Sequence, residues 1–142
     1  MKTLQTEIII GATPEKVWAI LTDFEKFPQW NPFIVKLEGK PEVSTALRAE
    51  LKNGKGVSVF KPKVLVADKN KAFEWLGSLP IPGIFNGHHY FRIEPLTNGQ
   101  IKFIHGEEFT GLLAGLIMKQ IGEQTRSGFI AMNKALKERA EG

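Results

Sequence analysis

The stretch LLAGLIMKQIGEQTRSGFIAMNKALKER, residues 112–139, decides the fold of this chain. It contains no proline, and residues with good helix propensity dominate it. Apolar or small residues recur in it at spacings of three and four, which predicts one long amphipathic helix with a single inward stripe. That stripe consists of Ile117, Ile121, Thr125, Gly128, Met132 and Leu136. At 1.5 Å per residue the helix is about 42 Å long, so it needs an extended partner surface.

The residues before this helix supply that surface as β-strands. In several segments apolar residues alternate with polar ones, a period of two that is typical of strands with one solvated face. These segments are 3–10, 33–38, 45–52, 57–66, 73–79, 87–94 and 101–109. Asn53-Gly54 is a strong signal for a hairpin turn, and Pro62 inside the segment 57–66 predicts an edge position or a bulge there.

Two short helices are expected after the first strand. Thr13 followed by Pro14 predicts a helix start, because the hydroxyl caps the first turn and proline is tolerated at the first helical position. A second helical piece is expected over 23–27, ended by Pro28. Strands joined by turns pair antiparallel, and the long helix is the available cover for their apolar face. We therefore predict an α+β fold with a curved antiparallel sheet of about 6–7 strands.

The composition is that of an ordinary globular chain. Its 142 residues predict one domain over 1–142, and its 42% hydrophobic and 24% charged residues argue against disorder. The absence of cysteine excludes disulfides, thiolate metal ligands and cysteine nucleophiles. The longest apolar run, 112–118, is far shorter than the roughly 18 residues of a membrane span, and polar residues at 5–7 interrupt any signal-peptide core. We expect a soluble, cytoplasmic protein.

The net charge of +4 is mild, and the lysines that produce it are spread along the chain. Dispersed lysines beside turns and on polar strand faces are typical of a solvated surface. We therefore expect no nucleic-acid partner. The excess of positive charge still allows a weak, transient attraction to an anionic membrane.

The centre of the long helix gives the clearest indication of a cavity. The stripe has large residues at both ends, but its middle positions fall on Gln124, Thr125 and Gly128. Small and polar residues at inward positions leave space and offer hydrogen-bonding groups to it. The alternative is that a bulky neighbour, such as Trp75, fills the gap, because protein interiors tolerate few voids. Both interpretations remain open at this point.

Three titratable residues occupy strand positions that alternation assigns to the buried face: His89, His105 and Glu107. Buried polar groups are costly unless they are paired, and directly opposite residues on neighbouring strands lie about 5 Å apart. The three residues are therefore either satisfied core groups or the polar lining of a pocket, where they are the candidate catalytic residues. Two histidines and a glutamate are an admissible zinc set, but no HExxH helix accompanies them. We expect no metal and no cofactor.

Several motifs along the chain resemble one known family. They are FPQWNPF at 27–33, FKPKV at 60–64, FEWLG at 73–77, GHHYFRIEP at 87–95 and EEFTGLL at 107–113. Together they resemble the SRPBCC family, the START-like group of polyketide cyclases/dehydrases and lipid-transport proteins. The resemblance implies the Bet v 1-like helix-grip fold, in which a curved antiparallel sheet wraps around a long C-terminal helix and leaves a deep apolar cavity between them.

The resemblance also implies which residues face the cavity. From the strands and the loop after the short helices these are Trp30, Trp75, His89, Phe91, Phe103, His105 and Glu107. The apolar loop 79–85 and the helix start 112–118 are implied to lie together at the cavity mouth, as a gate, as a contact with a membrane or partner, or simply packed on each other. With the loop and the helix stripe, the expected ligand-binding set adds Leu79, Phe85, Ile117, Ile121, Gln124, Thr125 and Gly128.

The expected function is the binding of a small hydrophobic molecule, such as a lipid, a polyketide-like compound or an aromatic compound. Hydrophobic burial then supplies most of the affinity, and a few polar groups set the orientation. The alternative is a polyketide cyclase/aromatase or dehydratase that uses a cavity His or Glu as general acid or base. A third interpretation is that the apolar loop binds another protein or a second copy of this chain. The chain is then either a monomer or a homodimer. The residues leave the identity of the ligand open.

Overall fold

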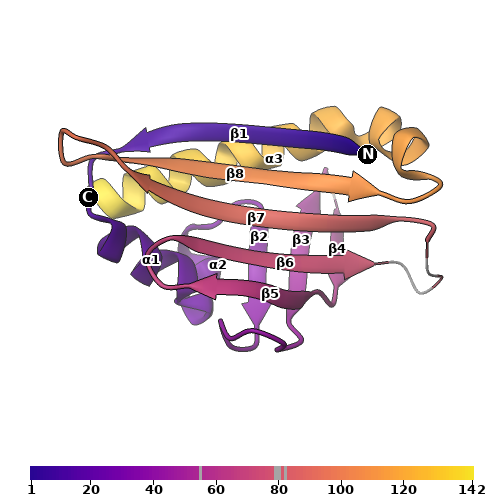
Figure 1. The fold of residues 1–142 in the computed structure, drawn as a ribbon, viewed down its shortest axis with the longest axis horizontal. Coiled ribbons are helices and arrows are strands. Elements are labelled where there is room, and N and C mark those ends of the chain that lie inside the picture. Colours follow the sequence, from indigo (N-terminus) through magenta and orange to yellow (C-terminus); the bar gives the residue numbers. More distant parts are fainter. Residues whose placement is uncertain (55, 79–80, 82) are drawn as a thin grey trace.

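Two antiparallel sheets grip one long helix in the computed structural model, which describes residues 1–54, 56–78, 81 and 83–142 (Figure 1). The elements follow in the order β1 (Lys2–Ile10), α1 (Pro14–Thr22), η1 (Phe24–Lys26), α2 (Phe27–Trp30), β2 (Ile34–Glu38), β3 (Arg48–Asn53), β4 (Gly56–Phe60), β5 (Lys63–Asp68), β6 (Ala72–Ser78), β7 (Asn86–Pro95), β8 (Ile101–Thr110) and α3 (Ala114–Glu141). This order confirms the predicted α+β helix-grip fold.

The larger sheet has the strand order β1-β8-β7-β6-β5, and the smaller sheet has the order β2-β3-β4. An isolated bridge between Ala46 and Lys63 connects the two sheets. Beside it, Leu47 N–H donates to the Pro62 carbonyl at 2.8 Å, and Val64 N–H donates to Thr45 O at 3.0 Å. In Figure 1, β2–β4 run across the direction of the other five strands, and α3 lies behind β1 and β8. The continuous wall therefore bends around the helix.

The sequence pattern predicts one strand over 57–66, and this prediction is wrong. It forms the end of β4 and the start of β5, with Pro62 between them. Proline has no N–H to donate to a strand ladder, so the regular pairing stops there. The chain turns from the small sheet to the large one at this point, which is why the structure has eight strands where the sequence predicts about 6–7.

The first helix begins as predicted. Thr13 Oγ1 accepts a hydrogen bond from Lys16 N–H at 3.1 Å, and Pro14 occupies the first turn of α1. The second helical piece differs from the expectation over 23–27. A short 3₁₀ turn, η1, runs directly into α2, and Pro28 lies in the first turn of α2 instead of ending a helix. Proline is tolerated there because the amide hydrogens of a first turn have no partner within the helix.

The predicted stripe of α3 divides into a buried half and a more exposed half. Phe129, Met132 and Leu136 are fully buried in the main core. Towards the N-terminal end of the helix, Ile121 is 40% exposed and Leu113 is 39% exposed. The core is therefore closed under the second half of α3 and gives way to a cavity under the first half.

Gly128 lies at the transition between these two halves. A Cβ atom there would overlap the ring of Phe33. This ring is itself held in place, since it packs edge-on against Phe129 at 5.5 Å and lies 6.2 Å from the His105 ring between centroids. The prediction that Gly128 opens onto the cavity is therefore wrong. A bulky neighbour does fill the gap at this position, and it is Phe33 rather than Trp75.

We expect Gly128→Ala to destabilise the protein by about 1–3 kcal/mol, because the new methyl group forces the packed Phe33 ring out of place. This loss outweighs the gain of up to about 1 kcal/mol from replacing a helical glycine with alanine. Gly122→Ala is the matched control, since its Cβ would meet only the Met118 methyl at an ordinary 3.7 Å. It should be stabilising. Urea unfolding of both variants measures the difference, and equal effects would contradict this packing argument.

Candidate functional site

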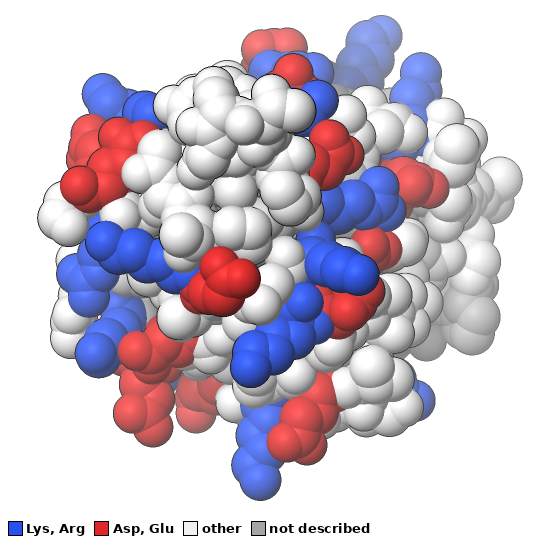
Figure 2. All heavy atoms as spheres, turned by 60° about the vertical axis from the view of Figure 1, so that its left-hand side comes forward, with Lys and Arg blue, Asp and Glu red and all other residues white. Residues whose placement is uncertain are grey.

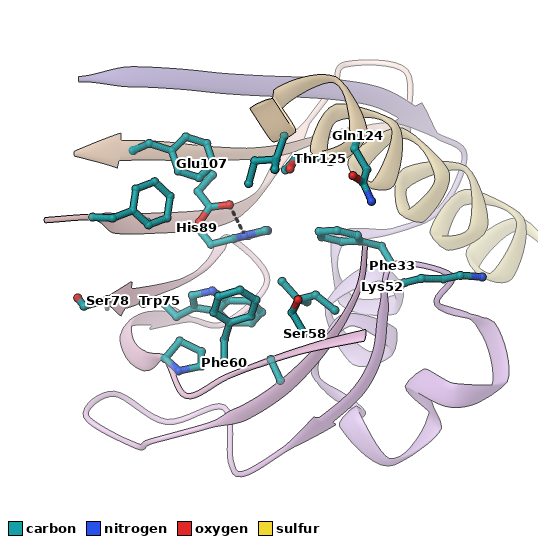
Figure 3. A pocket seen from close by; sticks show the side chains of 18 residues that line it. Phe33, Lys52, Ser58, Phe60, Trp75, Ser78, His89, Glu107, Gln124 and Thr125 are labelled. Carbon is teal, nitrogen blue, oxygen red and sulfur yellow. Dashed lines mark ion pairs between the residues drawn. The ribbon is translucent and has the colours of Figure 1, made fainter. Parts of the chain in front are cut away.

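A cavity of about 210 Å³ lies between α3, the β3–β4 hairpin and the strands β6–β8 (Figure 3). Most of its wall is apolar, and the polar side chains are few. The lining residues are Phe33, Ala49, Leu51, Lys52, Ser58, Phe60, Pro62, Trp75, Gly77, Ser78, Phe85, Gly87, His89, Glu107, Phe109, Ile121, Gln124 and Thr125. This volume is below the roughly 300–1,000 Å³ of pockets for drug-sized ligands. It exceeds the approximately 150 Å³ of an engineered apolar cavity that binds benzene.

The structure brings together about half of the residues that the sequence predicts as ligand-binding. Those that line the cavity are Trp75, Phe85, His89, Glu107, Ile121, Gln124 and Thr125. Those that do not line it are Trp30, Phe91, Phe103, His105, Ile117 and Gly128. Leu79 lies outside the described residues. The ligand-binding role of the seven lining residues stays a prediction, and the cavity is the setting in which it is tested.

The residues that miss the cavity do so for identifiable reasons. Phe91 and Phe103 stack on each other at 6.1 Å inside the main hydrophobic core, and neither borders the cavity. Trp30 packs edge-on against Phe27 and borders a separate surface pocket with Lys16 and Arg139. Alternation predicts the face of a residue correctly in these strands, but not how far along the sheet the cavity extends.

The sequence does not predict that the β3–β4 hairpin forms part of the cavity wall. Ala49 and Leu51 share one face of β3, a pattern visible in the sequence, but nothing local shows that this face covers a cavity. Two glycines in the sequence do indicate part of the cavity lining. Gly77 and Gly87 lie opposite each other on β6 and β7, and a glycine inside a strand often marks a close approach by another group.

Glu107 and His89 form the polar corner of the cavity. They are directly opposite each other on β8 and β7, as the sequence allowed, and Glu107 Oε1 lies 3.2 Å from His89 Nδ1. The side chain of His89 is 2% exposed and that of Glu107 is 17% exposed. A Cβ at Gly87 would overlap Glu107 Oε2, so the bare backbone of Gly87 leaves room for the carboxylate. Figure 3 shows the pair at one side of the cavity, with the polar side chains of Ser58, Gln124 and Thr125 elsewhere in its wall.

Behind this corner a chain of buried hydrogen bonds runs away from the cavity. His89 Nε2 lies 2.7 Å from His105 Nε2, and His105 Nδ1 lies 2.9 Å from Asn133 Oδ1. Asn133 Nδ2 donates to Thr6 Oγ1 at 2.8 Å, and Thr6 Oγ1 donates to the His105 carbonyl at 2.9 Å. The three titratable candidates therefore divide: His105 is a satisfied core group, whereas His89 and Glu107 reach the cavity.

Burial lowers the pKa of His105 well below its usual value, and the neighbouring His89 acts in the same direction, against a smaller opposing effect of the hydrogen bond to Asn133. The His105 ring is stacked on Phe129, with centroids 4.1 Å apart, and lies 4.7 Å from the Phe91 ring. A positive charge between these rings would be poorly solvated. His105 is therefore a neutral imidazole near pH 7.

The loop before β7 and the start of α3 lie together, as the resemblance implies. Leu112 N–H donates to Gly83 O, and Leu113 N–H donates to Ile84 O, both at 2.9 Å. Ile81 is 67% exposed and Leu112 is 81% exposed, so these two side chains are not buried against each other. A role of this exposed apolar surface as a gate, or as a contact with a membrane or partner, stays a prediction.

The charged surface shows no region of one sign on the face drawn in Figure 2, where Lys and Arg are interspersed with Asp and Glu. Ion pairs such as Lys102–Glu94 and Lys26–Asp23 join neighbouring charges. Within the described part of the chain, no group of three or more His, Cys, Asp or Glu side chains is arranged to hold a metal ion. No helix in that same part is both long and apolar enough to cross a membrane.

Comparison with known proteins gives a family and a set of structures with the same fold. A family model described as polyketide cyclase / dehydrase and lipid transport matches residues 1–141. No curated protein matches. The aromatase/cyclase Zhui from Streptomyces sp. R1128 superposes with a TM-score of 0.76 at 14% identity, over 99% of this chain and 93% of that one.

Two further solved structures extend this comparison. A START superfamily protein from Mycobacterium smegmatis has a TM-score of 0.71 at 23% identity, covering 98% of this chain and 97% of its own. Norcoclaurine synthase from Thalictrum flavum, in complex with dopamine and hydroxybenzaldehyde, has a TM-score of 0.73 at 15% identity, covering 97% and 85%. At these identities the likeness shows the fold alone.

The lowered pKa of His105 predicts a loss of stability in mild acid. Below about pH 6.5 the unfolded chain binds a proton at this residue that the folded chain does not, so this contribution to stability is fully present above that pH and is lost progressively as the pH falls below it. The slope from this one group is at most about 1.4 kcal/mol per pH unit. His105→Gln should flatten the curve measured by urea unfolding relative to the wild-type protein. Equal curves for the variant and the wild-type protein would refute this assignment.

Proposed function

The chain belongs to the polyketide cyclase / dehydrase and lipid transport family, and we propose that it binds a small, mostly apolar molecule in the cavity between α3 and the sheets. The observation that carries this proposal is the cavity itself, an apolar space of about 210 Å³ with the His89–Glu107 pair at one corner. Native interiors are close-packed, so a void of this size needs a reason. A bound guest supplies one.

The volume sets the size of the guest. A space larger than one that holds benzene and smaller than a drug-sized pocket suits a molecule of about one aromatic ring, or a short branched chain. Norcoclaurine synthase was solved with dopamine and hydroxybenzaldehyde, each of which has a single ring, so the fold is compatible with guests of this size. A longer ligand, such as a lipid or a polycyclic polyketide, would have to extend out through the mouth beside Phe60 and Ile121.

The expected affinity is modest. An aromatic ring buries roughly 200 Å² of surface, which contributes about 5 kcal/mol at 25 cal/mol per Å². This corresponds to a dissociation constant of roughly 0.1–1 mM for the ring alone. Any tighter binding has to come from the polar corner or from contacts at the mouth.

A second candidate function is acid–base catalysis on the bound molecule. It is favoured by one observation, the contact between a carboxylate and an imidazole at the wall of an apolar cavity. In such a site a carboxyl group can remove a proton next to a carbonyl while the imidazole holds or returns it. The family is named for cyclases and dehydrases, and proton transfer of this kind is one way to carry out such reactions.

The binding proposal predicts that a larger side chain inside the cavity displaces the guest. Thr125 lines the cavity from α3, and Ser127 lies on the exposed side of the same helix two residues further on. Thr125→Leu should raise the dissociation constant of 4-methylphenol at least about tenfold, because the added methyl groups occupy the guest volume. Ser127→Leu is the matched control and should leave it unchanged. Isothermal titration calorimetry measures both.

Two outcomes would count against binding in this cavity. One is equal affinity of both variants for 4-methylphenol, which would place the ligand elsewhere. The other is the absence of binding by any single-ring compound at millimolar concentration, together with native mass spectra of protein purified without detergent that show no bound small molecule.

The catalytic candidate makes a separate prediction. With a poly-β-ketone analogue as substrate, Glu107→Leu should abolish cyclisation or dehydration while the substrate still binds, because the apolar wall remains. The same loss is expected for His89→Phe. If turnover by the wild-type protein is absent, or if both variants keep the wild-type rate, the acid–base interpretation is wrong.

A further inference from the structure

The direction of the buried hydrogen-bond chain follows from a group that can only accept. The His105 carbonyl oxygen lies 2.9 Å from Thr6 Oγ1. A carbonyl has no hydrogen to donate, so the hydroxyl hydrogen of Thr6 must lie between these two oxygens. Thr6 has only one hydroxyl hydrogen. It is therefore an acceptor towards its other neighbour, Asn133.

This assignment fixes the orientation of the Asn133 amide. The atom that lies 2.8 Å from Thr6 Oγ1 has to be the NH₂ nitrogen, so the amide oxygen faces His105 Nδ1 at 2.9 Å. An amide oxygen only accepts, and His105 must therefore carry a hydrogen on Nδ1. Because buried His105 is neutral, its Nε2 is bare and accepts.

The bare Nε2 of His105 in turn determines the role of His89. Its Nε2 lies 2.7 Å from the bare Nε2 of His105, so His89 supplies the hydrogen of that contact. His89 Nδ1 then faces Glu107 Oε1 at 3.2 Å. Two bare acceptors this close together in a mostly buried corner would repel each other, so the arrangement favours one further hydrogen between them. This hydrogen belongs either to an imidazolium beside a carboxylate or to a carboxylic acid beside a neutral imidazole. In both arrangements the pair carries no net charge.

The second oxygen of Glu107 is an acceptor in both arrangements. Oε2 lies over the bare backbone of Gly87 on the cavity side, and no hydrogen-bond partner for it occurs among the residues that the structure describes. When Glu107 is a carboxylate, Oε2 has only lone pairs. When Glu107 is protonated, the hydrogen is on Oε1 towards His89, and Oε2 is the carbonyl oxygen. The chain therefore presents one acceptor to the guest, and this acceptor belongs to a pair with no net charge.

We propose that Thr6, Asn133 and His105 are positioning residues that hold the proton of the His89–Glu107 pair between those two side chains, so that Glu107 Oε2 accepts a hydrogen bond from a neutral hydroxyl group on the ligand. The site is thereby selective for a phenol or an alcohol over an ether, a ketone or an ammonium ion. This proposal rests on the proposed binding function and names the chemistry of the ligand's polar end.

The remaining groups around the cavity are compatible with a neutral ligand. Lys52 on β3 is the only other side chain with a full charge among the described lining residues, and it is exposed. Gln124 and Thr125 on α3 are uncharged, and Gln124 approaches the hairpin turn at Gly54. On the strands next to Glu107, His88 points to the outer face, where it bonds Glu74 at 2.8 Å.

The first test reads the imidazole tautomers directly in the ligand-free protein, with long-range ¹H–¹⁵N correlation spectra at pH 7. We expect His105 protonated on Nδ1 alone and His89 protonated on Nε2. Thr6→Ser keeps the hydroxyl and should keep both assignments. Thr6→Val keeps the shape but removes the hydroxyl, so the Asn133 amide is free to turn over and a second His105 tautomer should appear.

The second test compares ligands of one shape: 4-methylphenol, 4-methylanisole and 4-methylbenzylamine, the last a cation at pH 7. Calorimetry should show the phenol binding about tenfold more tightly than the anisole, since only the phenol donates to Glu107 Oε2. The amine should bind no better than the phenol. Glu107→Leu should bind phenol and anisole equally.

Glu107→Gln distinguishes the two directions of the chain. If His89 Nδ1 is an acceptor, the new amide donates its N–H to it and turns its oxygen to the cavity, so the preference for phenol is retained. If His89 Nδ1 is a donor towards a bare carboxylate, the amide turns its NH₂ to the cavity, and the anisole gains relative to the phenol.

The outcomes separate this proposal from the binding function. His105 protonated on Nε2, unchanged tautomers in Thr6→Val, or equal affinity of the wild-type protein for phenol and anisole would each overturn it, whereas Glu107→Gln assigns the shared hydrogen to Glu107 or to His89 within it. If none of the three ligands binds, the proposed function fails, and the tautomer spectra still decide the direction of the chain.

Discussion

The contact between the Phe33 ring and the bare backbone of Gly128 sets where the core ends and the cavity begins. On one side of it, Phe129, Met132 and Leu136 close the space between α3 and the sheet. On the other side, the helix meets no equivalent filler, and Phe33 itself becomes part of the cavity wall. The Phe33 ring therefore separates the closed core from the cavity. A side chain at position 128 would overlap this ring and force it to move.

The polar corner formed by His89 and Glu107 also depends on the Phe33 ring. Phe33 and Phe129 flank the His105 ring and keep it dry, which makes His105 a neutral relay rather than a charged group. Four elements contribute to the hydrogen-bond chain that starts at Thr6, namely β1, β7, β8 and α3. Burying so many polar atoms is costly unless all are satisfied, and here each bond leads to the next until Glu107 reaches the cavity. In our proposal, the residues that satisfy the buried polar groups are also the ones that set up ligand recognition.

The family relationship explains the architecture but not the chemistry of the guest. The Zhui aromatase/cyclase and the START superfamily protein share this fold, although they are only 14% and 23% identical to this chain. The β3–β4 hairpin forms part of the cavity lining, and the bare backbone of Gly87 leaves room for the Glu107 carboxylate. A small cavity with one acceptor at its corner is a more specific feature than the fold, because one fold can host many functions.

Local sequence rules determined much of this protein: the capped helix after β1, the alternating strands, the long final helix, and the inward facing of His89, His105 and Glu107. These rules work because backbone periodicity and capping involve residues only a few positions apart. Tertiary structure alone decided that Pro62 joins two sheets, that Trp30 lies away from the cavity, and that Thr6 and Asn133, 127 positions apart, complete the polar chain. Periodicity gives the face of a residue, but only strand order, register and the angle of α3 decide which side chain it meets there.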